Sequence, residues 1–202
     1  MNVVDRYHDK FVFGRRVSVL SRHFAEVLPK NARVLDVGSG DGQMAVAIMR
    51  QRPDLQIEGV DVLIRPTTAI PVRQFNGTEL PFGDGSYDTV MLCDVIHHIV
   101  DPMPLLREVR RVAASAVAIK DHYSESRFDF ATLRFMDWVG NAKHGVALPY
   151  NYWSRRQWSE AFETLGLTVA ETRERLDIYI PPLELVFGRG LHFVTRLSVR
   201  QR

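Results

Sequence analysis

Short apolar runs alternate with amphipathic stretches along most of the chain. Runs rich in Val, Ile, Leu and Met that end at turn residues are typical of buried strands in a parallel sheet. Apolar residues three and four positions apart predict helices between them. We expect strands at 33–37, 56–61, 72–75, 87–93, 116–120, 167–180 and 192–198. We expect helices at 5–28, 42–50, 102–112, 128–139 and 154–165.

Two local signals refine this pattern. The stretch 62–71, between the second and third expected strands, contains Pro66, Pro71 and two adjacent threonines. Proline breaks a helix interior and threonine lowers helix propensity, so we expect no long helix there. Further along, Ser154 precedes an amphipathic run and Gly166 follows it, which is typical of a helix N-cap and C-terminus.

The composition fits one globular domain, which we expect to extend over residues 1–202. Of the 202 residues, 46% are hydrophobic and 25% are charged. A chain of this length can bury a core without disulfides or a structural metal. Because Cys93 is the single cysteine, the chain holds no intrachain disulfide framework, zinc knuckle or three-cysteine iron–sulfur site.

The charge balance gives no argument for a nucleic-acid partner. There are 26 Lys and Arg against 24 Asp and Glu, a net charge of +2. No apolar run approaches the ~20 residues that span a bilayer, and the first ten residues do not resemble a signal peptide, so we expect a cytoplasmic protein. The stretch 185–202 carries four arginines and no acid. It predicts either a solvated edge or a weak peripheral contact with a membrane or another phosphate.

The candidate chemistry begins at a glycine-rich turn after the first strand, where residues 34–42 read Val-Leu-Asp-Val-Gly-Ser-Gly-Asp-Gly. Glycines let the backbone approach a ligand, and the following helix N-terminus would offer unpaired N–H groups. Asp61 ends the second strand roughly 20 residues further on, where a carboxylate can bind a ribose diol. Gln43 stands where a dinucleotide site has its third glycine, and Asp36 and Asp41 would repel a pyrophosphate. This favours a nucleoside ligand that is poor in phosphate.

Four motifs occur in order at plausible spacing. They are 34–42, Gly59-Val60-Asp61, 75–82 with its continuation 86–90, and 93–102 leading into 105–112. Together they resemble the class I S-adenosylmethionine-dependent methyltransferases, of the group called type 11, over residues 32–119. The resemblance implies an α/β, Rossmann-like methyltransferase fold: a mostly parallel seven-stranded sheet with an antiparallel final strand and helices on both faces. It also implies S-adenosyl-L-methionine as cofactor and S-adenosyl-L-homocysteine as product.

The resemblance also assigns cofactor roles to individual positions. Asp36 and the glycine loop would hold the methionine part, and Asp61 the ribose hydroxyls. Asn76 would bind the adenine amino group, although the family often has an acid there. The helix expected at 5–28 would cover the cofactor through Tyr7, Phe11 or Arg15. The implied cofactor-binding residues are Asp36, Gly38, Ser39, Gly40, Gly42, Gln43, Asp61, Val62, Asn76, Gly77, Thr78, Asp94 and Val95.

The same resemblance divides the single domain into four parts. They are an N-terminal helical cover (1–30), a cofactor-binding half (32–120), a substrate-side helical insertion (121–165) and the final strands (166–202). One departure concerns the turn before the fifth strand, where the family usually has Pro-Gly-Gly and this chain reads Val-Ala-Ala-Ser-Ala at 112–116.

Polar side chains that follow the fourth and fifth strands would face the methyl acceptor. They are His97, His98, Lys120, Asp121, His122 and Tyr123. Asp121 and His122 form the leading pair, because a neutral imidazole accepts a proton near pH 7, and His98 is the third catalytic candidate. The alternative is a strand end that hydrogen-bonds locally, with one of His97 and His98 structural. We assign no metal ligands, although Asp94 and Asp121 keep a metal-dependent O-methyltransferase open.

The segment 137–153 is rich in aromatic and amide side chains and lies between two expected helices. Aromatic walls with a few polar groups are typical of a small-molecule site, which would make this segment a substrate lid. The other interpretation is a hydrophobic closure of the sheet edge. His144 and Tyr152 are its candidate acceptor contacts.

These features predict an enzyme that methylates a small molecule by in-line displacement. The alternatives are methylation of RNA or protein, or a cofactor-binding scaffold without catalysis. The Asn-Pro-Pro-Tyr loop of base amino methylation is absent after the fourth strand, and Cys93 lacks the preceding proline of cytosine C5 methylation. The sequence leaves the acceptor atom and the oligomeric state open.

Overall fold

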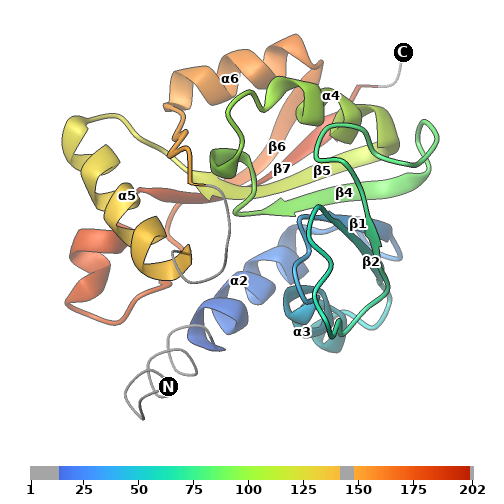
Figure 1. The fold of residues 1–202 in the computed structure, drawn as a ribbon, viewed down its shortest axis with the longest axis horizontal. Helices are drawn as coiled ribbons and strands as arrows, with labels where there is room; N and C mark the ends of the chain where they lie inside the picture. Colours follow the sequence, from blue (N-terminus) through green and yellow to red (C-terminus); the bar gives the residue numbers. More distant parts are fainter. Residues whose placement is uncertain (1–13, 142–147, 201–202) are drawn as a thin grey trace.

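The computed structural model describes residues 14–141 and 148–200, which are organised by one sheet (Figure 1). Its seven strands lie in the order β3-β2-β1-β4-β5-β7-β6. All neighbours pair in parallel except at β7, which is antiparallel to β5 and β6, so the expected fold class is confirmed. The strands are β1 (Arg33–Val37), β2 (Gln56–Asp61), β3 (Val72–Gln74), β4 (Tyr87–Cys93), β5 (Ala113–His122), β6 (Leu167–Arg173) and β7 (His192–Val199).

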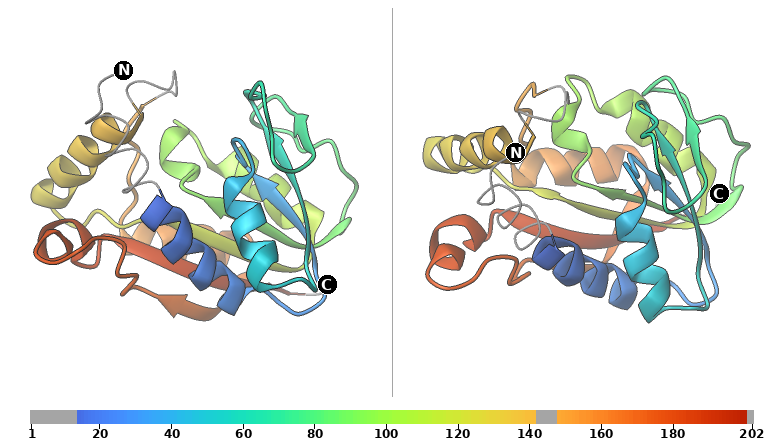
Figure 2. Two further views of the ribbon diagram at one scale, coloured as in Figure 1. Left: turned by 90° about the horizontal axis from the view of Figure 1, so that it is seen from below. Right: turned by 60° about the horizontal axis from the view of Figure 1, so that its bottom comes forward.

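Helices cover both faces of the sheet (Figures 1 and 2). One face carries α2 (Gly14–Val27) and α3 (Gln43–Gln51), and the other carries α4 (Met103–Val112) and α6 (Arg155–Thr164). Three elements lie toward the carboxyl ends of β4 and β5: the 3₁₀ turn η2 (Ile96–His98), the helix α5 (Arg127–Asn141) and the π-helical turn η3 (Glu184–Gly188). Within 14–141 and 148–200, no helix is both long and apolar enough to cross a bilayer.

An apolar core fills the space on each side of the sheet. Leu20 and Phe24 of α2 pack with Ile48 of α3 on one side, and all three are fully buried. Leu105 of α4 and Trp158 of α6 belong to the core on the other side. Burial of a side chain of this kind stabilises the fold by about 1.5–3 kcal/mol, so these layers hold the strand ends in fixed positions.

Several local predictions are confirmed. The stretch 62–71 contains no helix. Ser154 caps α6 with a capping box, since its side chain accepts from the Gln157 N–H and the Gln157 side chain accepts from the Ser154 N–H. Gly166 follows α6 with a φ of 65°, a conformation that glycine adopts without strain.

Other boundaries differ from the prediction. The helix expected at 5–28 is described from Gly14 to Val27, and its first residues lie outside the described part of the chain. β5 begins at Ala113 instead of 116, because α4 ends directly in extended backbone at Ala113 without a glycine turn. The strand expected to reach residue 180 ends at Arg173. After it the chain turns at Asp177, whose φ is 53°, while Leu176 and Ile178 enter the core.

Candidate functional site

The loop from β1 to α3 is built around glycines that no other residue could replace without strain. Gly38 and Gly42 have φ values of 74° and 79°, in the left-handed region. A Cβ on Gly38 would lie 2.5 Å from Cγ2 of Val95, and one on Gly42 would lie 2.5 Å from Cγ1 of Ile70. Val95, expected at the cofactor, therefore closes against this loop.

Five N–H groups of the loop and helix start donate within the protein, whereas no partner is described for the N–H groups of Asp41, Met44 and Ala45. Gly38 and Ser39 donate to the Val60 carbonyl, at 2.8 and 3.2 Å. Gly40 donates to Asp61 Oδ2 at 2.8 Å. Gly42 and Gln43 donate to Ser39 O and Asp41 Oδ1. The reason is that the loop folds back on the end of β2. The carboxylates of Asp36 and Asp61 beside the loop favour a cationic ligand over a phosphate.

Two carboxylates stand at the ends of β1 and β2. Asp36 is 2% exposed, and its burial together with the charge of Asp61 raises its pKa to about 7. Asp61 is held in one orientation because Oδ1 accepts from the Leu63 N–H at 2.9 Å and Oδ2 from the Gly40 N–H. A carboxylate oxygen accepts more than one hydrogen bond, so Asp61 can still bind a diol.

Asn76 and Val62 form the far side of this loop region. The Asn76 Oδ1 accepts from the Thr78 N–H at 2.9 Å, the Thr78 hydroxyl at 3.1 Å and the Glu79 N–H at 2.7 Å. The side chain therefore has only its Nδ2 donors left, so the acceptor role expected for it at an adenine amino group does not fit this geometry. Val62 is 53% exposed, and its Cγ1 is 3.3 Å from where a Cβ on Gly77 would lie. This open apolar surface suits a flat ring.

A charged cluster joins the ends of β4 and β5. Lys120 Nζ lies 2.5 Å from Asp94 Oδ1, and Arg16 of α2 donates to Asp94 Oδ2. His122 Nε2 is 3.6 Å from Asp94 Oδ1. Burial opposes ionisation of Asp94, but the charges of Arg16 and Lys120 hold its pKa well below the usual range. The Asp94 carboxylate thus stays charged and fixed beside the glycine loop.

The sequence pointed to Arg15 as a cover for the cofactor, whereas the structure turns Arg16 toward this cluster. Arg15 instead donates to the carbonyls of Asp177 and Ile178, both at 2.9 Å. Adjacent residues of a helix point about 100° apart, and sequence periodicity alone does not fix which of two neighbouring arginines faces the site. Tyr7 and Phe11 lie outside the described residues.

His97 forms a buried pair with Asp121. Its Nδ1 lies 2.8 Å from Asp121 Oδ1, and both side chains are 2% exposed. The Ile96 N–H donates to Asp121 Oδ2 at 3.1 Å and fixes the carboxylate. Burial alone would lower the pKa of His97, but the Asp121 charge raises it. On the other side of the ring, Nε2 is 3.5 Å from Asp137 Oδ2, and Asp137 also accepts from the Tyr152 hydroxyl.

The pairing expected between Asp121 and His122 exists but is shared. His122 Nδ1 is 3.2 Å from Asp121 Oδ1 and 3.3 Å from His97 Nδ1. Burial and the nearby Lys120 charge lower the pKa of His122 to about 4, so it is neutral at pH 7. His98 is half-buried, with its ring centroid 4.1 Å from that of His97. The imidazole–carboxylate contact with the shortest distance therefore belongs to His97, which sequence reasoning had not placed among the three leading catalytic residues.

Three of these side chains have the spacing of a metal site. Atoms of Asp94, His97 and His122 lie within 4.8 Å of one another. Both Asp94 oxygens already bind a cationic side chain, Lys120 and Arg16. A metal ion bound by Asp94 would therefore be repelled by two nearby positive charges.

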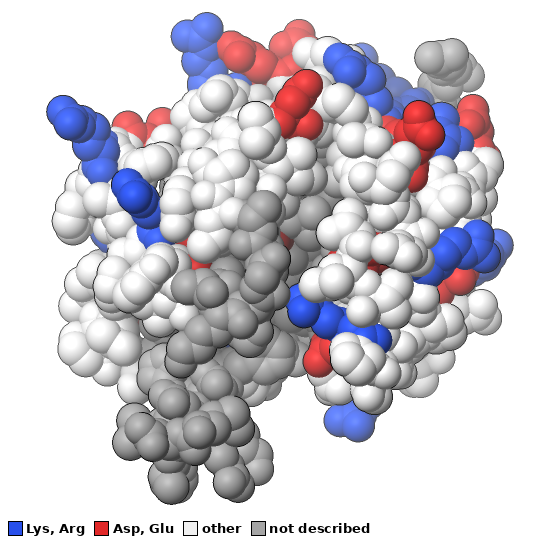
Figure 3. Space-filling view, viewed as in Figure 1, with Lys and Arg blue, Asp and Glu red and all other residues white. Residues whose placement is uncertain are grey.

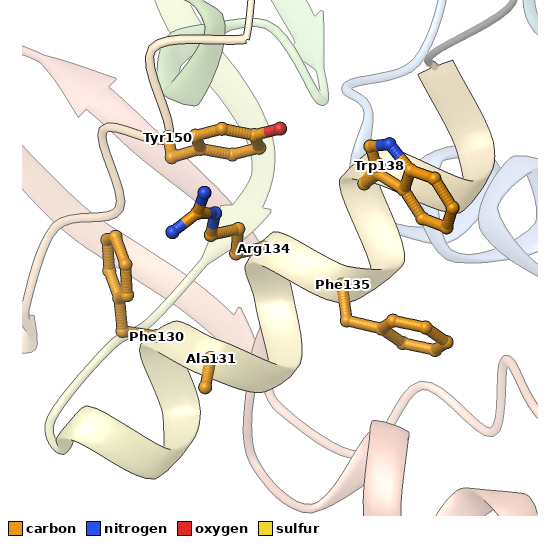
Figure 4. Close-up of a pocket in the computed structure, with 6 residues that line it drawn as sticks. All are labelled: Phe130, Ala131, Arg134, Phe135, Trp138 and Tyr150. Carbon is orange, nitrogen blue, oxygen red and sulfur yellow. The ribbon is translucent and has the colours of Figure 1, made fainter.

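The expected lid is described only in part. His144 lies outside the described residues. Tyr152 is buried, and its ring centroid is 5.7 Å from that of His97. Phe130, Arg134 and Tyr150 contribute to a groove with a volume of about 350 Å³ on the outer side of α5 (Figure 4).

Comparison with known proteins agrees with this arrangement. A family model described as a methyltransferase domain matches residues 8–172. A methyltransferase of Mycobacterium sp. (strain KMS) is 37% identical over 94 residues, which cover 43% of this chain and 36% of that protein. The ubiquinone/menaquinone biosynthesis C-methyltransferase UbiE of Geotalea uraniireducens is 33% identical over 112 residues, covering 48% of this chain and 46% of that protein. The matched stretches thus span less than half the length of these two relatives.

Solved structures share the fold over most of the chain. A methyltransferase from Haloferax volcanii, in complex with the Trm112 methyltransferase activator, has a TM-score of 0.73 at 21% identity, covering 96% of this chain and 94% of that one. A SAM-dependent methyltransferase from Thermotoga maritima has a TM-score of 0.65 at 19% identity, covering 98% and 96%. The chain therefore belongs to the methyltransferase-domain family and has the class I S-adenosylmethionine-dependent methyltransferase fold.

Proposed function

We propose that this chain transfers a methyl group from S-adenosylmethionine to a small-molecule acceptor that must lose a proton, with His97 as the base. The observation that carries the proposal is the buried His97–Asp121 pair at 2.8 Å, next to the charged cluster of Asp94, Lys120 and Arg16. An aspartate that holds one ring nitrogen of a histidine orients the other toward a substrate. The cytoplasmic, single-domain organisation expected from the sequence is part of this proposal.

The residues of the glycine loop fit this cofactor. Several of its N–H groups are engaged within the protein, and the acids beside it, Asp36 and Asp61, favour a ligand with positive charge and hydroxyl groups. S-adenosylmethionine carries an ammonium and a sulfonium but no phosphate. Asp61 would bind the ribose hydroxyls and Asp36 would attract the ammonium. Arg16, whose guanidinium has donors beyond its contact with Asp94, would bind the carboxylate.

When bound, the cofactor supplies a methyl group on a positively charged sulfur, which is open to in-line attack. The protein's task is to align the acceptor and to remove its proton. The Nδ1–H group of His97 donates a hydrogen bond to the Asp121 carboxylate, which leaves Nε2 to accept a proton from the substrate. The proton-bearing group of the substrate would take the place of Asp137 beside Nε2 of His97. Separation from Asp137 removes one of the charges that raise the pKa of His97, and this favours the neutral base.

The small-molecule acceptor is supported by the names of relatives such as the quinone C-methyltransferase and by the enclosure of His97 among buried side chains. Methylation of RNA or protein, and a scaffold without turnover, are the competing functions. The Haloferax volcanii relative is complexed with an activator protein, so an activator subunit is a candidate partner of this chain.

Calorimetry with S-adenosylmethionine tests the cofactor assignment first. Asp61→Ala should lower the affinity by about tenfold or more, because the ribose loses a charged acceptor. Glu163→Ala, which removes an exposed acid from α6, is the matched control and should bind like the wild type. Equal affinity of all three proteins would contradict the assignment.

Transfer of a labelled methyl group to the metabolite, protein and RNA fractions of a cell extract then tests the acceptor class. Label in the metabolite fraction is expected, and label confined to a macromolecule would overturn the proposal. His97→Gln should reduce turnover by about 10²- to 10⁴-fold while keeping cofactor affinity, and His98→Gln should reduce it far less. An active His97→Gln variant would mean that His122 or His98, and not His97, acts as the base.

A further inference from the structure

The outer face of α5 is apolar where a surface helix is normally polar. Phe128, Phe135 and Trp138 are 65%, 55% and 58% exposed. The only acids of α5 are turned away from this face: Asp129 is paired with Arg189, and Asp137 is buried. Within residues 127–139 the exposed side chains are Arg127, Phe128, Phe130, Ala131, Arg134, Phe135, Trp138 and Val139.

A second apolar segment lies beside α5. Residues 180–186 expose Ile180, Leu183, Leu185 and Val186. The segment is fastened to α5 through Arg189, which is 3.0 Å from Asp129 Oδ1 and has its guanidinium 4.5 Å from the ring centroid of Phe128. Figures 1 and 2 show α5 and η3 side by side. We call the exposed side chains of 127–139 and 180–186 the α5–η3 face.

This face is a concentration of apolar surface, not a chance scatter. Of the fourteen large hydrophobic residues that are exposed in the described part of the chain, nine belong to it. Single exposed hydrophobics are normal on a monomer, whereas a contiguous set marks an interaction surface. In Figure 3 the surface over α5 and η3 is mostly uncharged, with a few basic side chains.

The charge of the face is positive. Arg127 and Arg134 are exposed, and neither has an acidic partner among the described residues. Arg134 lies over the ring of Tyr150 at 5.2 Å, in the groove shown in Figure 4. Apolar and aromatic side chains beside unpaired arginines are the combination that inserts between lipid chains and pairs with lipid phosphates.

We propose that the α5–η3 face docks this protein on an anionic lipid bilayer. Phe128, Phe135 and Trp138 enter the interfacial layer, and Arg127 and Arg134 bind phosphate groups at its surface. Docking in this orientation turns the groove beside Tyr150 toward the lipid. The inference rests on the surface of α5 and η3 and not on the reaction, so it can be tested without an acceptor.

Vesicle flotation of the full chain tests the proposal. Vesicles of phosphatidylcholine with about one quarter phosphatidylglycerol should carry the protein, and vesicles of phosphatidylcholine alone should carry clearly less. Trp138 is an internal reporter because Trp158 is buried and Trp153 is half-buried. Its emission should shift to shorter wavelength when anionic vesicles are added, and the shift should be absent in Trp138→Phe.

Matched variants separate this face from the rest of the surface. Phe135→Ser combined with Leu185→Ser should weaken partitioning by at least about tenfold. Val100→Ser combined with Val169→Ser, two exposed apolar residues outside the face, should leave it unchanged. Arg127→Gln with Arg134→Gln should lower partitioning to anionic vesicles by roughly tenfold or more.

Three results would overturn the proposal. The first is a failure to float with anionic vesicles while the protein still binds S-adenosylmethionine or melts cooperatively. The second is an equal loss of partitioning in the control pair. The third is a dimer in light scattering that is lost in the Phe135→Ser and Leu185→Ser variant, which would assign the face to a second copy of this chain.

Discussion

The ammonium of Lys120 lies 2.5 Å from Asp94 Oδ1, between the ends of β5 and β4, with no part of the lysine side chain exposed. Arg16 reaches the second oxygen of the same carboxylate from α2. One acid thus pairs with two cations and ties α2 to the centre of the sheet. A buried charge that loses its partner destabilises the protein. Removal of the acid should therefore lower the stability more than removal of one of its two cations.

Asp94→Asn should lower the free energy of unfolding by about 3–5 kcal/mol, because Lys120 is left as a buried cation without an acid. Lys120→Met should cost less, because Arg16 still pairs with Asp94. Chemical denaturation of the ligand-free protein measures both values.

The double variant Asp94→Asn with Lys120→Met provides the control for this pair. It should be more stable than Asp94→Asn alone, since the unpaired ammonium is gone. Strict additivity of the two single effects would show that Lys120 and Asp94 do not stabilise each other.

The pKa of Asp36, raised to about 7 by burial and by Asp61, should make cofactor binding depend on pH. Only the ionised carboxylate attracts the ligand's ammonium, which stays protonated below pH 7. The affinity for S-adenosylmethionine should therefore rise roughly tenfold from about pH 5.5 to pH 7. Calorimetry at several pH values measures this, and Asp36→Asn should bind weakly with little pH dependence. The same pH dependence of the affinity in Asp36→Asn would mean that another group is responsible for it.

Two glycines with the same φ separate strain from ligand contact. Gly40 and Gly85 both have a φ of 58°, and a Cβ on either would make no contact shorter than 3.7 Å within the protein. Alanine at each should cost about 1–2 kcal/mol of stability, from the left-handed backbone alone. Only Gly40→Ala should also reduce the affinity for S-adenosylmethionine, because its Cβ would project from the loop into the open space assigned to the cofactor. Equal affinity of Gly40→Ala and Gly85→Ala for S-adenosylmethionine would show that the cofactor does not bind at this loop.

The sequence predicted the sheet and its glycine loop because their causes are local. Buried strands such as 87–93 are rich in apolar residues, and the left-handed turn between β1 and α3 requires glycines. The ends of elements were less predictable. The end of β6 at Arg173 depends on pairing with β7 and on the turn at Asp177, which are properties of the tertiary structure.

The chemistry of the site was only partly predictable, for the same reason. Asp121 was correctly placed among the groups after β5, but its main partner is His97, which precedes it by 24 positions. Which of three nearby histidines meets that carboxylate is decided by the η2 turn, a short element without a sequence signal. Arg16 was missed because its role depends on the rotation of α2 against β4.

Acid should destabilise the protein through His122. Burial and the charge of Lys120 lower its folded pKa to about 4, below the unfolded value of 6.5. The folded state therefore disfavours the proton, and the stabilisation is complete above pH 6.5 and is lost as the pH falls toward 4. The loss from this group should reach about 3 kcal/mol near pH 4. His192, whose pKa is also lowered by burial and by Lys120, acts in the same direction, and Asp36, whose pKa is raised, acts in the opposite one.

A comparison with His122→Gln isolates this contribution, because the other titrating groups are common to both proteins. Denaturation at a series of pH values should show the difference in unfolding free energy between wild type and variant shrinking as the pH falls from 6.5 to about 4. His23→Gln is the control, because His23 lies on α2 outside the cluster and bonds the Leu176 carbonyl. Its difference from the wild type measures the effect of removing an imidazole outside the cluster. A constant difference for His122→Gln would mean that its imidazole is not held neutral by burial beside Lys120.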